Sequence, residues 1–292
     1  MPELPDLLYI QSALAETLAG SSVEDVVIQR PVVLRNNFEQ SPSELLRGRS
    51  LIRVMIAGPF IILSFVGDVE VIINLMLAGR LQLQHHGEKP LGYRCCSIAF
   101  SGGVALHLSD DQTMAKVYLI PAGSRTLVPA LTTQGVDIMS SDFTPEAFCA
   151  ICKAHARKQV RVMINNHSIL SSIGNAYADE ILFEAGIHPK TLVGKLLPPD
   201  VDRLHQAIGS VITWGTEMVR NAHQPIHVKV REHMRVRNRH GSPCPRCGTT
   251  IRRAGVRGHD VYFCPQCQPA TRRQFIDWNG KAEASRQALK RP

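Results

Sequence analysis

Cys244-Pro245-Arg246-Cys247, followed after sixteen residues by Cys264-Pro265-Gln266-Cys267, decides the fold of the C-terminal part of the chain. Two Cys-x-x-Cys pairs at this spacing can place four thiolates tetrahedrally around one zinc ion and close a short β-hairpin. The segment between the pairs holds few other apolar residues, so the hairpin needs the metal in order to fold. Because protein ligands fill all four positions, we expect one structural Zn²⁺ and no catalytic role for it.

Basic side chains lie between the two cysteine pairs, namely Arg252, Arg253, Arg257 and His259. Cations on a metal-stiffened hairpin can meet phosphates at a small ordering cost. From Arg220 to Pro292 the chain carries sixteen Lys or Arg and four Asp or Glu, a formal charge of +12, whereas the preceding residues sum to −4. This segregation favours a nucleic acid as the partner, and the alternative is a well-solvated basic tail.

Residues 131–228 are predicted to form a helical domain. Thr144-Pro145-Glu146 is typical of a helix start, with a capping hydroxyl, a proline at the first position and an acid in the first turn. Further helices are expected over residues 158–165, 175–185 and 199–220. Cys149 and Cys152 fall inside the first helix without a second pair, so we interpret them as core residues.

Residues 1–130 are predicted to form an antiparallel β-sandwich preceded by a helix. Leu7, Ile10, Leu14 and Leu18 recur at helical spacing before Gly20. Short segments rich in Val, Ile and Leu then predict strands over residues 24–29, 51–56, 60–66, 69–77, 95–100, 104–108 and 116–120. We therefore expect an α+β fold: an N-terminal sandwich, a helical domain, a zinc finger over residues 240–268 and a basic tail over residues 269–292.

The start of the chain predicts a cytoplasmic protein. Met1-Pro2-Glu3-Leu4-Pro5-Asp6 begins with acids and prolines, unlike a secretory signal. The longest apolar stretch, residues 54–66, is interrupted by Gly58 and Pro59 and is too short to cross a bilayer. Together with the basic C-terminal part, this predicts a protein associated with the bacterial nucleoid, with no membrane partner.

Four motifs occur along the chain in a fixed order. They are the N-terminal Met1-to-Asp6 segment, Ser172-Ile173-Gly174-Asn175-Ala176-Tyr177-Ala178-Asp179-Glu180-Ile181-Leu182, Ala185-Gly186-Ile187-His188-Pro189, and the zinc hairpin ending at Cys267-Gln268. In this order and spacing they resemble the formamidopyrimidine-DNA glycosylase and endonuclease VIII family over residues 1–268. The resemblance implies a helix-two-turn-helix domain and a monomeric base-excision repair enzyme that acts on double-stranded DNA containing damaged bases or abasic sites.

The resemblance also implies the catalytic residues. Removal of Met1 would leave Pro2 with a free secondary amine, and an α-amino pKa near ~8 leaves an appreciable neutral fraction at physiological pH. Pro2 then matches the family nucleophile, which attacks the sugar C1′, forms an iminium and permits elimination at the 3′ phosphate. Glu3 matches the carboxylate that handles protons at the opening deoxyribose. The expected activities are DNA glycosylase and abasic-site lyase.

DNA-binding positions follow from the same resemblance. Asn175 and Lys158 match residues that bind phosphates flanking the lesion, although Lys158 is equally well interpreted as an ordinary surface lysine. His259, with Arg257 beside it, stands where the family has a zinc-hairpin arginine. Leu77 and Met114 are expected to fill the void left by a flipped base. His188 and Glu180 are interpreted as structural.

Three departures from the family pattern leave two functional readings open. The family lysine on a β-hairpin aligns with Pro59, and the zinc-hairpin arginine aligns with the shorter, partly charged His259. The void-filling loop with its arginine aligns with residues 110–115, and the companion methionine aligns with Leu77. One reading is a divergent glycosylase acting on a different lesion. The other is a damaged-DNA-binding protein that has lost catalysis. The short segment 222–239 weakens the case for 8-oxoguanine.

Overall fold

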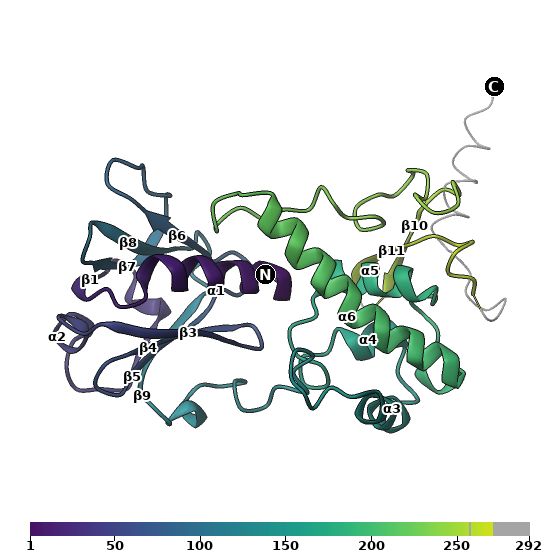
Figure 1. Ribbon diagram of the computed structural model, residues 1–292, viewed down its shortest axis with the longest axis horizontal. Coiled ribbons are helices and arrows are strands. Elements are labelled where there is room, and N and C mark those ends of the chain that lie inside the picture. The colour runs from purple at the N-terminus through teal and green to yellow at the C-terminus, as the bar shows by residue number, and fades with distance from the viewer. Residues whose placement is uncertain (257, 271–292) are drawn as a thin grey trace. The chain divides into compact units, whose positions relative to one another are not determined.

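The computed structural model describes residues 1–256 and 258–270, which divide into two compact units (Figure 1). The first unit comprises residues 1–137 and 215–231, and the second comprises residues 138–214 and the chain from Glu232 onward. Helix α6 therefore begins in the second unit and ends in the first. Of the predicted basic tail, residues 271–292 lie outside the described residues.

The first unit contains helix α1 (Leu4–Leu18) and two β-sheets. The four-stranded sheet has the order β1-β7-β8-β6, with β1 (Val23–Ile28), β7 (Arg94–Phe100), β8 (Val104–Ser109) and β6 (Arg80–Gln84). The five-stranded sheet has the order β2-β9-β5-β4-β3, with β2 (Leu34–Asn36), β9 (Lys116–Pro121), β5 (Val69–Asn74), β4 (Phe60–Phe65) and β3 (Leu51–Ala57). A short helix, α2 (Pro42–Leu46), precedes β3. The predicted helix and two-sheet architecture are confirmed.

One pairing departs from the predicted antiparallel sandwich. Strand β2 pairs with β9 in parallel, with Leu34 opposite Val117 and Asn36 opposite Leu119, while every other strand pair recorded in the described residues is antiparallel. Strand β2 spans only three residues and directly follows a turn of 3₁₀ helix at Pro31–Val33. It was not predicted, because three residues give no detectable alternation.

The sandwich core explains the spacing of the N-terminal leucines. Leu7, Ile10, Leu14 and Leu18 of α1 are all buried in the same cluster as inward-facing residues of both sheets. The opposite face of the five-stranded sheet buries a second cluster, formed by Phe60, Ile62, Ile72, Ile120, Val128 and Leu131. Strands β4 and β5 are therefore covered on both faces, which is why their sequences are almost continuously apolar.

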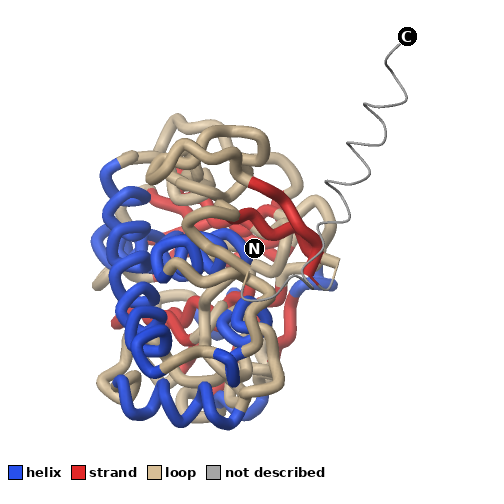
Figure 2. The backbone as a smooth tube through the Cα atoms, turned by 90° about the vertical axis from the view of Figure 1, so that its right-hand side faces the viewer, coloured by secondary structure: helices blue, strands red, loops and turns tan. Residues whose placement is uncertain are grey.

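The second unit is helical and carries a β-hairpin, as Figure 2 shows by colour. Its helices are α3 (Pro145–Ala154), α4 (Val160–Ile164), α5 (Asn175–Ala185) and α6 (Pro198–Asn221), and the hairpin pairs β10 (Arg252–Val256) with β11 (His259–Phe263). The Thr144 hydroxyl accepts the Ala147 N–H at 3.2 Å, as its capping role predicts. Helix α5 ends at Gly186, whose φ of 68° is the left-handed conformation that favours glycine.

Cys152 is buried on α3 and Cys149 is half-buried, in agreement with core packing. Among the described helices, none combines the length and the apolar character needed to span a membrane.

Candidate functional site

The N-terminus lies at the start of α1, with Pro2 and Glu3 both buried. Glu3 is the residue that precedes the helix, and its backbone N–H donates to the Asp6 carboxylate at 2.8 Å. Asp6 thereby satisfies one of the donors that a helix start leaves open. The two predicted catalytic residues are thus held at a rigid, capped helix end and not on a fraying terminus.

The amino group at this terminus lies in a partly dehydrated, cationic environment. The Met1 ammonium donates to the Leu77 carbonyl oxygen at 3.4 Å. Its pKa is lowered from 8.0 to about 6, first by burial and then by the charge of Lys229, against the opposing charges of Glu3 and Asp6. At neutral pH an amine in these surroundings is largely unprotonated. Surroundings of this kind favour the unprotonated, nucleophilic form of a terminal amine.

The chain after α6 forms one wall beside Pro2. We call residues 222–231 the return segment. The Tyr9 hydroxyl donates to the Gln224 carbonyl oxygen at 2.8 Å, and both Arg231 Nη atoms reach the Asp6 carboxylate, at 2.6 and 2.8 Å. Ile226 packs against the sandwich core. The return segment is thus fastened along one face of α1.

A small depression at Pro2 is shared by these elements. Its lining includes Pro2 and Asp6 of the N-terminal part, Gly79 and Arg80 at the start of β6, and residues 226–229 of the return segment. Gly79 has a steric reason to be glycine, because a Cβ there would come within 2.5 Å of the Leu75 carbonyl oxygen. The β5–β6 turn therefore packs tightly against its own backbone beside the N-terminus.

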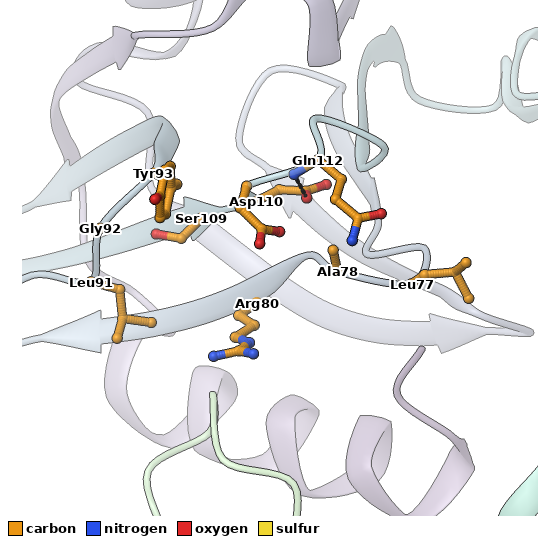
Figure 3. Close-up of a pocket in the computed structure, with 10 residues that line it drawn as sticks. Leu77, Ala78, Arg80, Leu91, Gly92, Tyr93, Ser109, Asp110 and Gln112 are labelled. Carbon is orange, nitrogen blue, oxygen red and sulfur yellow. Dashed lines mark hydrogen bonds between the residues drawn. The ribbon is translucent and has the colours of Figure 1, made fainter.

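A larger cavity of about 420 Å³ opens next to this turn (Figure 3). Arg80 of β6, Tyr93 of the segment before β7, and Asp110 and Gln112 of the loop after β8 are among the residues that line it. Leu77 lies at its edge with 61% of its surface exposed. Met114 is half-buried and is not among the lining residues. Of the two predicted void-filling side chains, Leu77 is therefore the more exposed to solvent.

Asp110 holds the loop after β8 through hydrogen bonds to its backbone. The side chain is buried and its carboxylate accepts the N–H groups of Gln112 at 2.9 Å and Ala115 at 2.7 Å. It therefore shapes the loop and does not face solvent. Tyr93, which sequence reasoning did not single out, is 70% exposed, and its carbonyl oxygen accepts the Asp110 N–H at 3.0 Å. A lone tyrosine between strands carries no sequence signal.

Pro59 occupies the turn between β3 and β4, where the family has its lysine. It follows Gly58, whose φ is +56° and whose added Cβ would come within 2.5 Å of the Gln134 side chain. The turn is therefore closely covered by residue 134 and offers no cation of its own.

Asn175 opens helix α5 and is held by a buried arginine. Arg161 Nη2 donates to the Asn175 side-chain oxygen at 2.8 Å, and Arg161 Nε donates to Asp179 at 3.1 Å. Arg161 and Asp179 are both almost completely buried. Because the amide oxygen is engaged by Arg161, the amide N–H groups of Asn175 are the donors left for an anion at the helix N-terminus.

Helix α5 also binds the segment that leads into the zinc hairpin, through the buried carboxylates of Asp179 and Glu180. Asp179 also binds Arg237 at 2.8 Å and accepts the Tyr262 N–H at 3.3 Å. Glu180 accepts the backbone N–H groups of Arg235, Val236 and Arg237 at 2.9 to 3.1 Å. These contacts support the structural interpretation of Glu180.

His188 has the same structural character. It is buried edge-on against Phe263, and burial followed by the charge of Lys190 lowers its pKa to about 4. The neutral imidazole Nδ1 accepts the Lys190 N–H at 3.2 Å.

The four predicted zinc ligands converge. The Cys244 and Cys267 sulfurs are 3.8 Å apart, those of Cys247 and Cys264 are 3.5 Å apart, and all four lie within 4.8 Å of one another. Thiolates that bind zinc tetrahedrally at about 2.3 Å stand about 3.8 Å from each other, so the geometry fits one structural Zn²⁺. Phe183 of α5 packs into the same cluster as Cys244 and Cys264.

The hairpin presents cations to solvent. Arg252, Arg253 and His259 are exposed, and Arg253 lies 3.5 Å from Asp260. Arg257 lies outside the described residues. Lys158 is half-buried just before α4, and its carbonyl oxygen accepts the Val193 N–H at 2.9 Å.

Three family models match successive parts of the chain between residues 1 and 270. Residues 1–117 match the formamidopyrimidine-DNA glycosylase N-terminal domain, residues 134–225 the helix-two-turn-helix domain of that enzyme, and residues 241–270 a zinc finger found in FPG and IleRS. The formamidopyrimidine-DNA glycosylase of Thermosynechococcus vestitus is 30% identical over 279 residues, covering 92% of this chain and 98% of the relative. That of Pelotomaculum thermopropionicum is 27% identical over 278 residues, covering 92% and 99%.

Solved structures show the same architecture. The MutM (Fpg) protein from Thermus thermophilus superposes with a TM-score of 0.80 at 25% identity, covering 93% of this chain and 100% of the other. A Lactococcus lactis Fpg in complex with abasic-site DNA has a TM-score of 0.82 at 20% identity, covering 92% and 100%. By domain content, sequence and fold, the chain belongs to the formamidopyrimidine-DNA glycosylase family.

Proposed function

We propose that this protein excises damaged bases from double-stranded DNA and cleaves the resulting abasic site, with Pro2 as nucleophile and Glu3 as acid and base. Family membership makes it a DNA-repair glycosylase that carries one structural Zn²⁺. The observation that carries the catalytic assignment is the buried position of Pro2 and Glu3 at the capped start of α1, where burial lowers the pKa of the neighbouring Met1 amino group from 8.0 to about 6. We take a monomer as the acting form.

The chemistry follows from a secondary amine placed beside a carboxylic acid. On a damaged nucleotide, the Pro2 nitrogen bonds to C1′ and gives up its proton, and the base leaves with the electrons of its glycosidic bond and takes up a proton. Glu3 protonates O4′ as the sugar ring opens, and the nitrogen lone pair completes an iminium. Loss of a 2′ proton then gives an enamine, which expels the 3′ phosphate. At an abasic site the amine instead adds to the aldehyde carbon and water leaves.

DNA binding is proposed to rest on Asn175, Lys158 and the exposed hairpin cations. We expect Asn175→Ala to weaken binding about tenfold on every sequence, because a hydrogen bond to a charged phosphate contributes about 1.5–3 kcal/mol. Lys158→Ala should reduce the slope of log affinity against log salt by about one, whereas the neutral Asn175 should leave this slope unchanged. Fluorescence anisotropy at several salt concentrations measures both quantities.

The matched control is Asn221→Ala, an exposed asparagine at the end of α6. It should bind like the unmodified protein. Equal affinity of the Asn175 and Asn221 variants would remove Asn175 from the DNA-binding surface.

The lesion preference is proposed to differ from that of a lysine-containing enzyme. An abasic site requires no recognition or displacement of a base, so the absence of the family lysine and arginine should reduce the rate least on this substrate. We expect single-turnover cleavage of abasic DNA to exceed excision of 8-oxoguanine by at least about 100-fold, the range that one proton-transferring group supplies. Pro59→Lys should then raise 8-oxoguanine excision. Equal rates on the two substrates would contradict this preference.

A damaged-DNA-binding protein without catalysis is the second candidate. Pro59 in the place of the family lysine is the observation that favours it. Binding of abasic DNA with no cleavage and no covalent adduct would establish this candidate and exclude the first.

A further inference from the structure

The nucleophile site draws its positive charge from the return segment. The charged and titratable groups around the amine and its depression come from α1, from β6 and from residues 222–231. They are Glu3, Asp6, Arg80, His227, Lys229 and Arg231.

Among these groups, Lys229 is the cation that acts on the amine. Its side chain lines the same small depression as Pro2, and its charge contributes to the lowered pKa of the Met1 amino group. Arg231 is bound to the Asp6 carboxylate through both Nη atoms, so its charge is largely neutralised by its partner. Arg80 lines the same depression but is not among the charges that shift this pKa.

The position of Lys229 is built into the fold. Arg231, two residues after Lys229, forms an ion pair with Asp6. Val230, which separates Lys229 from Arg231 in the sequence, is buried. On the other side, Ile226 is packed on the sandwich core and Gln224 accepts the Tyr9 hydroxyl. The backbone at position 229 is therefore fixed from both directions, while the lysine side chain itself is exposed and can reach the amine.

We propose that Lys229 is a further catalytic residue, whose ammonium beside the Pro2 nitrogen supplies the cation that Pro59 cannot provide. This inference rests on the proposed function. While Met1 is present, its carbonyl carbon is bonded to the Pro2 nitrogen. In the covalent intermediate, C1′ of the sugar takes the place of that carbon. The Met1 amine, three bonds from that nitrogen, thus marks the space of the attached sugar, and Lys229 reaches into it.

A cation at this place has two chemical effects. It disfavours protonation of the Pro2 amine, so more of the amine carries the free electron pair that forms the bond to C1′. It also donates hydrogen bonds towards the attached sugar and its phosphate oxygens. The first effect depends on pH, and the second does not.

The test is the pH dependence of covalent trapping. Protein lacking Met1 is mixed with a duplex containing an abasic site and borohydride, and the initial rate of adduct formation is measured from pH 5.5 to 9. The variants are Lys229→Met, Lys229→Arg and, as the matched control, Lys89→Met, an exposed lysine that does not act on the amine.

Removal of the Lys229 charge should raise the pKa of the amine and move the rate profile to higher pH. One pKa unit corresponds to a tenfold change in the neutral fraction well below the pKa, so we expect Lys229→Met to be about three- to tenfold slower at pH 6. Above pH 8.5 the pH-dependent part of this difference should vanish. Lys229→Arg keeps the charge and should retain the original profile, as should Lys89→Met.

Each other outcome decides against the proposal. An unshifted profile for Lys229→Met, or a loss of equal size at every pH, would overturn it, because a lysine that only bound phosphate would behave in the second way. Failure of Lys229→Arg to restore the profile would also contradict it. Failure of the proposed function looks different, since the unmodified protein would then form no adduct at any pH.

Discussion

Pro2→Gly is expected to reduce strand cleavage at abasic sites by about 100-fold or more, as the loss of a dedicated nucleophile does in other enzymes. Glycine leaves a primary amine in the same place, which forms a neutral imine that must be protonated before elimination. Proline forms a permanently cationic iminium. The loss is therefore expected to come from the imine that must be protonated and not from burial of the terminus, which the two variants share.

Single-turnover cleavage of an abasic duplex measures this effect. Pro31→Gly is the control, because Pro31 is an exposed proline in a 3₁₀ turn of the same unit. Comparable cleavage by both glycine variants, with Met1 removed from each protein, would contradict the assignment of Pro2.

Glu3→Gln is expected to slow turnover by about 10²–10⁴-fold, the contribution of a positioned acid or base. The substitution keeps the size of the side chain and removes its proton-transfer function. Attack by the amine on an abasic aldehyde does not require this carboxylate, so the trapped adduct should still form while strand cleavage stalls. The ratio of adduct to cleaved product should therefore rise.

Glu16→Gln provides the comparison on the same helix, since Glu16 is exposed in α1. It should cleave at the unmodified rate. Loss of adduct and cleavage in parallel in Glu3→Gln, with an unchanged melting temperature, would instead indicate that Glu3 acts before the covalent step.

Local sequence patterns predicted much of the fold. The spacing of apolar residues in α1, the capped start of α3 and the Gly186 stop of α5 are decided within a few residues of the chain. The zinc site follows from the chemistry of four thiolates, and the convergence of the sulfurs confirms it. By contrast, β2 and its parallel pairing depend on a distant neighbour, with Leu34 opposite Val117, which no local pattern encodes.

The proposed catalytic site was predictable in part. Pro2 and Glu3 belong to a recognisable motif, but the proposed cation Lys229 does not, because the fold brings it to the terminus through the Arg231–Asp6 ion pair, whose members are 225 residues apart in sequence. The sequence alone placed residues 222–228 in the helical domain, whereas the return segment belongs to the first unit. The structural role of Asp110 was not predictable either, because it depends on contacts with the N–H groups of its own loop.

Borohydride trapping on an abasic duplex, followed by mass spectrometry of the digested complex, tests the central claim most directly. The protein is first shown by its intact mass to lack Met1. We expect a covalent complex in near-stoichiometric yield, with the sugar remnant attached to the N-terminal peptide at Pro2. Tight binding of the same duplex with no trapped complex, or an adduct on a lysine side chain with Pro2 unmodified, would contradict it.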